Sequence, residues 1–334
     1  MASLGRRDIM NTKLPLIIHF FAAAAIAVVL PFLVPSFVLA TEILIFGMAV
    51  IGCNLLLGYT GLLSFGQALF FGSGAYVAGL LSIHLNLDII STLAVTIVSG
   101  AVIAVFVGFF AIRRAGIYFI MLTLAFAQLG YYIAFLAEPI TGGEDGLLDI
   151  QRPALSVPFM PSIDFNTDTT FYTLTGAIFV FIFVLMQRLV NSPLGSVLTA
   201  IKQNEARAEA VGYPVKLYKI VVFAFSGAVT ALAGALYAFM LKFAPLSNID
   251  LETSSQVLFM TILGGLGSIY GSVLGAGVFL IASDIFAELW PRWMILLGLL
   301  LIFVMLYMPG GVSKTLETLS AALLGRTSKR GTKK

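Results

Sequence analysis

The chain has 334 residues, of which 60% are hydrophobic and 10% are charged, and its formal net charge is +3. Soluble globular proteins carry about 25% charged residues, so this composition and a mean hydropathy of +1.03 exclude that class. No charged residue lies near the middle of any long apolar run between residues 14 and 308, which argues against a membrane protein with an ion relay of its own.

Ten apolar runs approach the length of about 20 residues that a membrane-spanning helix needs. They are residues 14–34, 38–57, 62–83, 89–112, 116–137, 171–190, 220–241, 253–267, 270–289 and 293–308. We therefore expect an all-α polytopic membrane protein with about ten spans in one transmembrane domain, residues 14–308. Eight spans plus two re-entrant segments are the alternative. The first run exceeds the roughly 7–15 apolar residues of a signal peptide, so we expect an uncleaved anchor.

The basic residues predict the orientation, because lysine and arginine favour the cytoplasmic side. With the amino terminus inside, all of the 19 lysines and arginines except Arg152, Lys242 and Arg292 lie inside. Residues 1–13, the loop 191–219 and the basic tail 309–334 are then cytoplasmic, and the acidic loop 138–170 is periplasmic. Five spans precede that loop and five follow it, which suggests a 5+5 inverted repeat.

Two stretches, residues 58–76 and 264–277, are unusually rich in glycine and small polar residues for membrane segments. Glycine destabilises helices by about 1 kcal/mol relative to alanine, and broken backbone at membrane depth persists only where protein buries it or it lines a wet cavity. The candidate residues of a translocation path are Asn54, Thr60, Gly61, Ser64, Gln67, Gly264, Gly265, Gly267 and Ser268. Close helix packing and hydrogen bonds between helices are the alternative, and the sequence leaves both open.

A glycine-rich motif follows the fifth run, in the predicted outer loop. It consists of Thr141, Gly142, Gly143, Glu144, Asp145 and Gly146. It is a candidate gate or docking turn for an external partner, and a simple glycine-rich turn is the alternative.

The inner loop contains a predicted amphipathic helix from Pro193 to Val211. Ser192 is a favourable N-cap, proline suits the first helical position, and Gly212 ends the helix. Its apolar residues recur on one face, but the helix mixes charge signs and has few bulky apolar groups. An interfacial membrane helix usually has a strongly basic polar face, so a groove on a partner protein is favoured over the membrane surface.

Enzyme chemistry finds little support in the sequence. His19 and His84 are the two histidines, and no metal-ligand cluster, catalytic motif or P-loop occurs. We therefore expect no catalytic residue, no metal site and no ATP site in this chain, and no nucleic-acid partner. Cys53 is the single cysteine, which excludes a disulfide within the chain.

Residues 54–76 resemble the signature of LivM-type permeases of the branched-chain amino acid ABC importers. The similarity extends to residues 141–147, 200–212 and 264–268. The resemblance implies that the helix from Pro193 to Val211 is the coupling helix, similar in role to the EAA loop of other importers. The residues implied in ATPase coupling are Ile201, Lys202, Asn204, Glu205, Arg207, Glu209 and Gly212. The spacing from Glu205 to Gly212 is one residue longer than usual, and Gln67 replaces the histidine common in the family.

The resemblance further implies a permease subunit in the bacterial inner membrane, in contact with membrane lipid. Its partners would be a LivH-like permease, two cytoplasmic ATPases that bind ATP and Mg²⁺, and a periplasmic solute-binding protein. The expected solutes are branched-chain or other hydrophobic amino acids, or a related small solute such as urea, an amide or an aromatic acid. The alternative function is an autonomous secondary transporter or channel for a small neutral solute.

Overall fold

A computed structural model describes residues 16–85, 87–114, 116–154, 164–308 and 310–315. Within these ranges the chain forms helices and no β-strand, apart from one isolated antiparallel bridge between Leu147 and Ala244. The helices are α1 (Leu16–Leu33), α2 (Phe37–Asn54), the π-helical turn η1 (Leu55–Thr60), α3 (Gln67–Leu85), α4 (Ile89–Ala111), α5 (Ile117–Leu136), α6 (Glu138–Thr141), η2 (Gly143–Asp145), α7 (Asp168–Val190), α8 (Pro193–Gln203), α9 (Glu205–Ala210), α10 (Val215–Leu241), η3 (Leu246–Ile249), α11 (Leu251–Gly264), α12 (Ile269–Leu289) and α13 (Trp293–Tyr307). The predicted all-α class is confirmed.

Seven helices in the described ranges are long and apolar enough to cross a membrane, which agrees with the predicted polytopic membrane protein. α2 and η1 together form one of them, from Phe37 to Thr60. α1, α11 and α13 occupy the first, eighth and tenth predicted runs but are shorter. The third run begins later than predicted, because residues 61–66 are not helical and α3 starts at Gln67.

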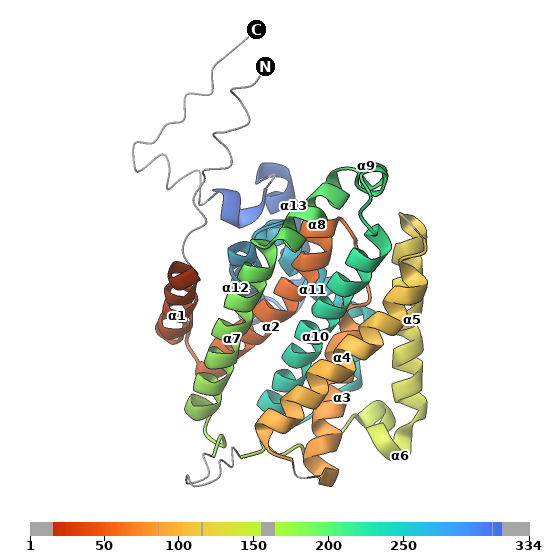
Figure 1. Ribbon diagram of the computed structural model, residues 1–334. Coiled ribbons are helices and arrows are strands. Elements are labelled where there is room, and N and C mark those ends of the chain that lie inside the picture. The colour runs from red at the N-terminus through yellow and green to blue at the C-terminus, as the bar shows by residue number, and fades with distance from the viewer. Residues whose placement is uncertain (1–15, 86, 115, 155–163, 309, 316–334) are drawn as a thin grey trace.

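The centre of the bundle is formed by α2 and α10. α10 packs against α2, α3 and α4, and α2 also packs against α7 and α12 (Figure 1). In the most apolar part of each span, 83% of residues are buried in α2–η1 but only 22% in α5. Both helices are hydrophobic, so hydropathy alone cannot tell which one is central and which one faces lipid. Small residues such as Gly227 and Gly234 let α10 approach its neighbours closely.

The two ends of the bundle carry different short elements. α8 and α9 lie at one end, and α6 lies at the opposite end (Figure 1). The predicted single helix from Pro193 to Val211 is divided at Asn204, whose extended backbone (φ −163°) separates α8 from α9. Ser192 precedes α8 as predicted, but its hydroxyl donates to the Leu189 carbonyl instead of capping the helix.

Candidate functional site

Two interruptions of helical structure lie next to each other in the bundle. The first break is η1 together with the non-helical residues 61–66, and the second break is the loop 265–268 between α11 and α12. Gly61, Gly265 and Gly267 have φ values of 75°, 110° and 84°, a backbone region that glycine adopts without strain. The glycine-rich stretches therefore interrupt helices only at these two breaks, since residues 67–76 belong to α3 and residues 269–277 to α12. Their role in a translocation path stays a prediction.

Asn54, at the last turn of α2, joins the two breaks. Its fully buried side-chain nitrogen donates to the Ser268 carbonyl at 2.9 Å, to the Ser272 hydroxyl at 2.8 Å and to the Gly265 carbonyl at 3.5 Å. Its oxygen accepts a hydrogen bond from the Gly267 amide at 2.9 Å. Loop backbone groups lack the regular partners of a helix, and this carboxamide supplies part of them, while the Ser268 carbonyl also accepts from the Ser272 amide at 3.1 Å. We refer to the four bonds of the Asn54 side chain as the Asn54 clamp.

Gln67, at the start of α3, is bonded between helices in the same way. Its nitrogen donates to the Ser226 hydroxyl at 3.2 Å, and its oxygen accepts from the Thr230 hydroxyl at 2.8 Å. Ser226 in turn donates to the Gly52 carbonyl at 2.7 Å. The side chain is fully buried, so this network joins α3 and α10 to α2.

Ser64 and Thr60 are also buried and are bonded locally. The Ser64 hydroxyl accepts from the Gly66 amide at 3.1 Å, and the Thr60 hydroxyl donates to the Leu56 carbonyl. Every polar side chain singled out within residues 54–67 thus has a partner inside the chain. This geometry favours hydrogen bonding within the bundle for Asn54 and Gln67, and contact with a solute stays a prediction for both.

Ser254 was missed by the sequence analysis, although it fixes the end of the first break. Its hydroxyl donates to the Phe65 carbonyl at 2.6 Å and accepts from the Ala68 amide at 2.9 Å. The Thr123 hydroxyl accepts from the Phe65 amide at 3.3 Å. An isolated hydroxyl residue inside an apolar span is the signal that could have found Thr123, because such a group needs a partner away from water. Ser254 lies in the polar run 252–256, which gives no such signal.

The second break depends on close backbone contacts. A Cβ atom on Gly264 would lie 2.0 Å from the Gly271 carbonyl oxygen, so α11 and α12 meet without side chains between them. The Ser268 hydroxyl accepts from the Gly271 amide at 3.1 Å and caps α12. Both residues therefore define where α11 stops and α12 starts.

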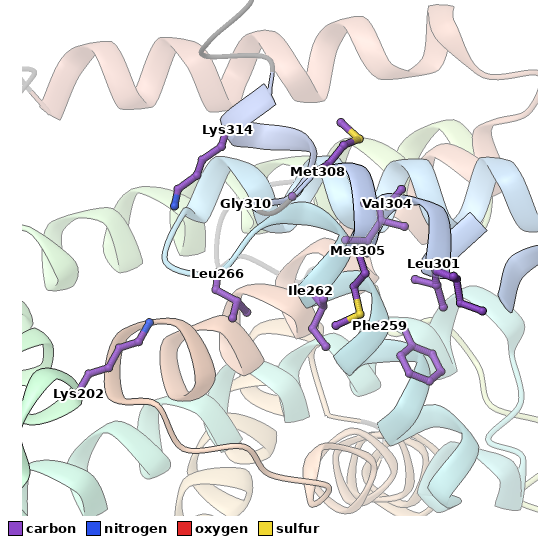
Figure 2. Close-up of a pocket in the computed structure, with 13 residues that line it drawn as sticks. Lys202, Phe259, Ile262, Leu266, Leu301, Val304, Met305, Met308, Gly310 and Lys314 are labelled. Carbon is purple, nitrogen blue, oxygen red and sulfur yellow. The ribbon is translucent and has the colours of Figure 1, made fainter. Parts of the chain in front are cut away.

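An apolar cavity of about 480 Å³ lies beside the second break, between α11 and α13. Figure 2 shows Phe259 and Ile262 from α11 facing Leu301 and Met305 from α13. Lys202 and Lys314 also line the cavity. An apolar cavity with cationic groups is suited to an amphipathic molecule. None of the predicted path residues lines it, although Leu266, in the second break, does.

The predicted coupling residues lie together on α8, α9 and the turn that follows. The Asn204 side chain accepts from the Arg207 amide at 2.9 Å and caps α9. Arg207 and Glu209 are exposed, which leaves them free to contact a partner protein. Gly212 follows α9 with φ of 98°, as predicted for a residue that ends a helix.

Ile201 and Glu205, two of the predicted coupling residues, contact the bundle. Ile201 is 3% exposed and packs with Ala208 and Val215 in a small apolar cluster. The Lys219 ammonium, on α10, lies 2.6 Å from a Glu205 carboxylate oxygen. Lys219 is buried and Glu205 is half exposed, so the ion pair joins the surface of α9 to the interior of the bundle.

The glycine-rich motif at the opposite end forms a compact turn. The Thr141 hydroxyl donates to the Ala134 and Ala137 carbonyls, which fixes the end of α5. Three glycines with positive φ complete the turn; they are Gly142 (79°), Gly143 (61°) and Gly146 (73°). Glu144 and Asp145 are exposed at its tip, where their carboxylates can meet an external partner. The gate or docking role stays a prediction.

Arg152, which the sequence analysis treated only as an outer cation, is buried and joins two helices at this end of the bundle. Its guanidinium donates to the Phe239 carbonyl at 2.9 Å and the Met240 carbonyl at 3.2 Å at the end of α10. It also contacts Asp168 at 3.2 Å and lies 4.4 Å from the centre of the Phe171 ring. The terminal carbonyls of a helix have no partner within the helix, so Arg152 ties α10 to the start of α7.

Replacing Arg152 with methionine is expected to destabilise the protein by about 2–3 kcal/mol, because buried carbonyls lose a charged donor. Lysine should not rescue the loss, since it lacks the planar fork of arginine. Thermal unfolding, followed through the thiol reactivity of the buried Cys53, measures the effect. Lys242→Met is the matched control, because Lys242 lies at the same end but is exposed. Equal unfolding midpoints for the two variants would show that Arg152 does not stabilise the contact between α10 and α7.

Comparison with known proteins places this geometry in a family. The family described as "Branched-chain amino acid transport system / permease component" matches residues 36–305. The chain is 27% identical to the high-affinity branched-chain amino acid transport system permease protein LivM of Salmonella typhimurium, over 88% of this chain and 74% of that protein. It is 26% identical to LivM of Escherichia coli, over 87% of this chain and 73% of that protein.

A shorter similarity reaches a different importer. The ribose import permease protein RbsC of Haemophilus influenzae is 31% identical over 26% of this chain and 29% of that protein. No solved structure gives a significant match. The family match covers α2 through most of α13 and includes both breaks, the outer turn, α8 and α9. The chain therefore belongs to the family of branched-chain amino acid transport permeases, and it is a LivM-type transport subunit rather than an enzyme.

Proposed function

We propose that this chain moves branched-chain or other hydrophobic amino acids across the bacterial inner membrane, as one permease subunit of an ATP-binding cassette importer. The observation that carries the proposal is the family match over residues 36–305. The names of the similar LivM proteins supply the solute class. Related solutes such as urea, amides or aromatic acids are the other candidates, and the uptake experiment described below includes examples of them.

The importer requires partners. A LivH-like permease completes the membrane part, a periplasmic binding protein delivers the solute, and two cytoplasmic ATPases bind ATP and Mg²⁺. This chain holds no cofactor of its own. The similarity to a LivH permease protein of Methanocaldococcus jannaschii, 28% identical over 36% of this chain, supports a common origin of the two permeases.

The topology we propose counts α1, α11 and α13 with the seven longer helices, so that ten spans place both termini in the cytoplasm. α8 and α9 then face the ATPases, and the turn from Thr141 to Gly146 faces the binding protein. The separation of these elements to opposite ends of the bundle supports this assignment (Figure 1). Five spans on each side of the outer loop form an inverted repeat.

The mechanism we propose is alternating access driven from α8 and α9. Arg207 and Glu209 are exposed for contact with an ATPase, while Ile201 and Glu205 attach the same helices to the bundle. Motion at this end reaches the two breaks, where residues near Gly61 and Gly265 border the path. Glycine at these positions permits backbone rearrangement that a regular helix would resist.

Reconstitution in proteoliposomes tests the function. The complex of this chain with its LivH-like permease, the ATPases and the binding protein is expected to accumulate radiolabelled leucine, isoleucine or valine only when ATP and Mg²⁺ are supplied. Phenylalanine and urea define the limits of the solute class. Uptake by this chain alone, under a proton or sodium gradient without ATP, would instead establish the autonomous secondary transporter.

A further inference from the structure

We propose that Lys202 is a positioning residue that holds the first break to α8 and thereby couples the motion of α8 to both breaks. The inference rests on the proposed function, since it concerns how the ATPase stroke reaches the path. It goes beyond that function by naming one side chain and one backbone carbonyl as the mechanical link. The link runs from Lys202 to Gly58, and from Gly58 to the Asn54 clamp.

The first step of the link is a short, charged hydrogen bond. The Lys202 ammonium donates to the Gly58 carbonyl oxygen at 2.6 Å. Gly58 lies within η1, close to the end of the helical segment, where carbonyls lose their partners along the helix. Hydrogen bonds with an ionised donor are about twice as strong as neutral ones. Lys202 therefore satisfies a backbone acceptor that the break itself leaves open.

The stem of Lys202 adds an apolar contact. A Cβ atom built on Gly61 would lie 3.4 Å from the Lys202 Cγ atom, so the aliphatic part of the side chain lies over the turn. The ammonium and the stem thus contact Gly58 and Gly61, three residues apart on the same break. Two separated contacts define an orientation as well as a position, and a rotation of α8 would move the turn with it.

The second step passes from Gly58 to the second break. A Cβ atom on Gly58 would lie 1.9 Å from the Asn54 side-chain oxygen and 2.5 Å from the Gly267 amide nitrogen. The backbone at Gly58 is therefore packed directly against the Asn54 clamp, with no space for relaxation between them. Asn54 holds Gly267 and Ser268 through its own hydrogen bonds. A displacement of Gly58 reaches the loop between α11 and α12 through hard contacts.

The ion pair of Glu205 with Lys219 cannot replace this link. Lys219 belongs to α10, a continuous helix of 27 residues, so that pair attaches α9 to a rigid element. Ile201 contributes apolar packing, which is not directional. Lys202 instead contacts a π-helical turn, an irregularity that is frequent at functional sites. Lys202 therefore connects α8, the helix proposed to move, to η1, an irregular segment that can change conformation.

Lys202→Met in the complete importer tests the inference. Methionine retains an apolar stem but has no donor. We expect the solute transported per ATP hydrolysed to fall by about fivefold, because Lys202 is exposed and solvent weakens a charged interaction there, while ATP hydrolysis stays within about twofold of wild type. Lys202→Gln is expected to uncouple similarly, and Lys202→Arg, which keeps a charged donor, to restore at least part of the ratio.

Lys216→Met is the matched control, because Lys216, like Lys202, is an exposed lysine near the same end of the bundle but belongs to α10 and not to α8. Its transport-to-hydrolysis ratio should equal that of wild type. A purely structural role for Lys202 would reduce assembly, uptake and hydrolysis together, and that result would overturn the inference. An unchanged ratio in both Lys202→Met and Lys202→Gln would overturn it as well.

The design separates this inference from the proposed function. If the wild-type complex shows no ATP-dependent uptake of any of the solutes, the proposed function fails. If the wild-type complex transports and the Lys202 variants transport with the same ratio, the function stands and the link fails. Amide hydrogen exchange gives a second readout, since the Gly267 amide should exchange faster in Lys202→Met than in Lys216→Met. Equal exchange in the two variants would contradict the second step.

Discussion

Replacing Asn54 with leucine is expected to abolish uptake and to destabilise the protein by about 2–6 kcal/mol. The substitution keeps a similar shape but leaves the Gly267 amide and the carbonyls of Gly265 and Ser268 without the bonds that Asn54 supplies. Each unpaired buried group costs about 1–3 kcal/mol. The Gly267 amide and the Gly265 carbonyl are the groups affected most, because the Ser268 carbonyl keeps its bond from the Ser272 amide at 3.1 Å. Since whole proteins are stable by only about 5–15 kcal/mol, a loss of this size reduces the folded population sharply.

The chain carries its own reporter for this measurement. Cys53 is the single cysteine, it is 1% exposed, and it precedes Asn54. A thiol-reactive fluorophore should therefore label wild-type protein in detergent only as it unfolds on heating. The labelling midpoint is expected to fall by many degrees in Asn54→Leu, and uptake by the reconstituted complex should be lost.

Two further variants sharpen the test. Asn54→Asp keeps an acceptor for the Gly267 amide but cannot donate to the Ser268 carbonyl, so it should be nearly as damaging as leucine. Gln256→Leu is the matched control, because the Gln256 amide bonds to Glu252 one turn earlier on its own helix. A wild-type midpoint for Asn54→Leu would show that the second break is stable without the clamp.

The breaks illustrate how far sequence reasoning reaches. Glycine content predicted interrupted helices at residues 58–76 and 264–277, and the positive φ values at Gly61, Gly265 and Gly267 agree. The remainder of both stretches, residues 67–76 and 269–277, is regular helix in α3 and α12. What the pattern could not supply was their mutual placement. Asn54 and its partners are separated by more than 200 residues, and hydropathy does not encode the register between two helices. Asn54 could be singled out from the sequence, but the residues to which it forms hydrogen bonds could not.

The coupling region shows a different limit. The apolar face and the terminal residues predicted one helix from Pro193 to Val211, but Asn204 starts a new helix by capping α9 with its own side chain. Asparagine forms such local bonds readily, so the same residue is compatible with either a helix interior or a cap. The role of Lys202 was likewise implied only by family resemblance, because the Gly58 carbonyl that it contacts is a backbone group without a sequence signal.

The contact between α3 and α10 leads to the second large prediction. Gly74→Val is expected to prevent correct packing and to destabilise the protein by about 3 kcal/mol or more, at the upper end for overpacked sites. A Cβ atom on Gly74 would lie 2.0 Å from the Ala231 carbonyl oxygen, and one on Gly234 would lie 1.8 Å from the Phe71 carbonyl oxygen. The backbones of α3 and α10 are therefore in direct contact at two places. Carbonyl oxygens within a helix cannot rotate away to make room for a side chain.

A variant at Gly74 tests two interpretations of this part of the first glycine-rich stretch, a translocation path or close helix packing. If Gly74 serves packing, Gly74→Val should lower the labelling midpoint of Cys53 and reduce the yield of assembled complex. Gly298→Val on α13 is the control, because no heavy atom lies within 4 Å of its added Cβ, and it should behave like wild type. A Gly74→Val complex that assembles with an unchanged midpoint but no longer transports would instead assign Gly74 to the path. The backbone distances favour packing, since a site with no room for a methyl group has none for an amino acid.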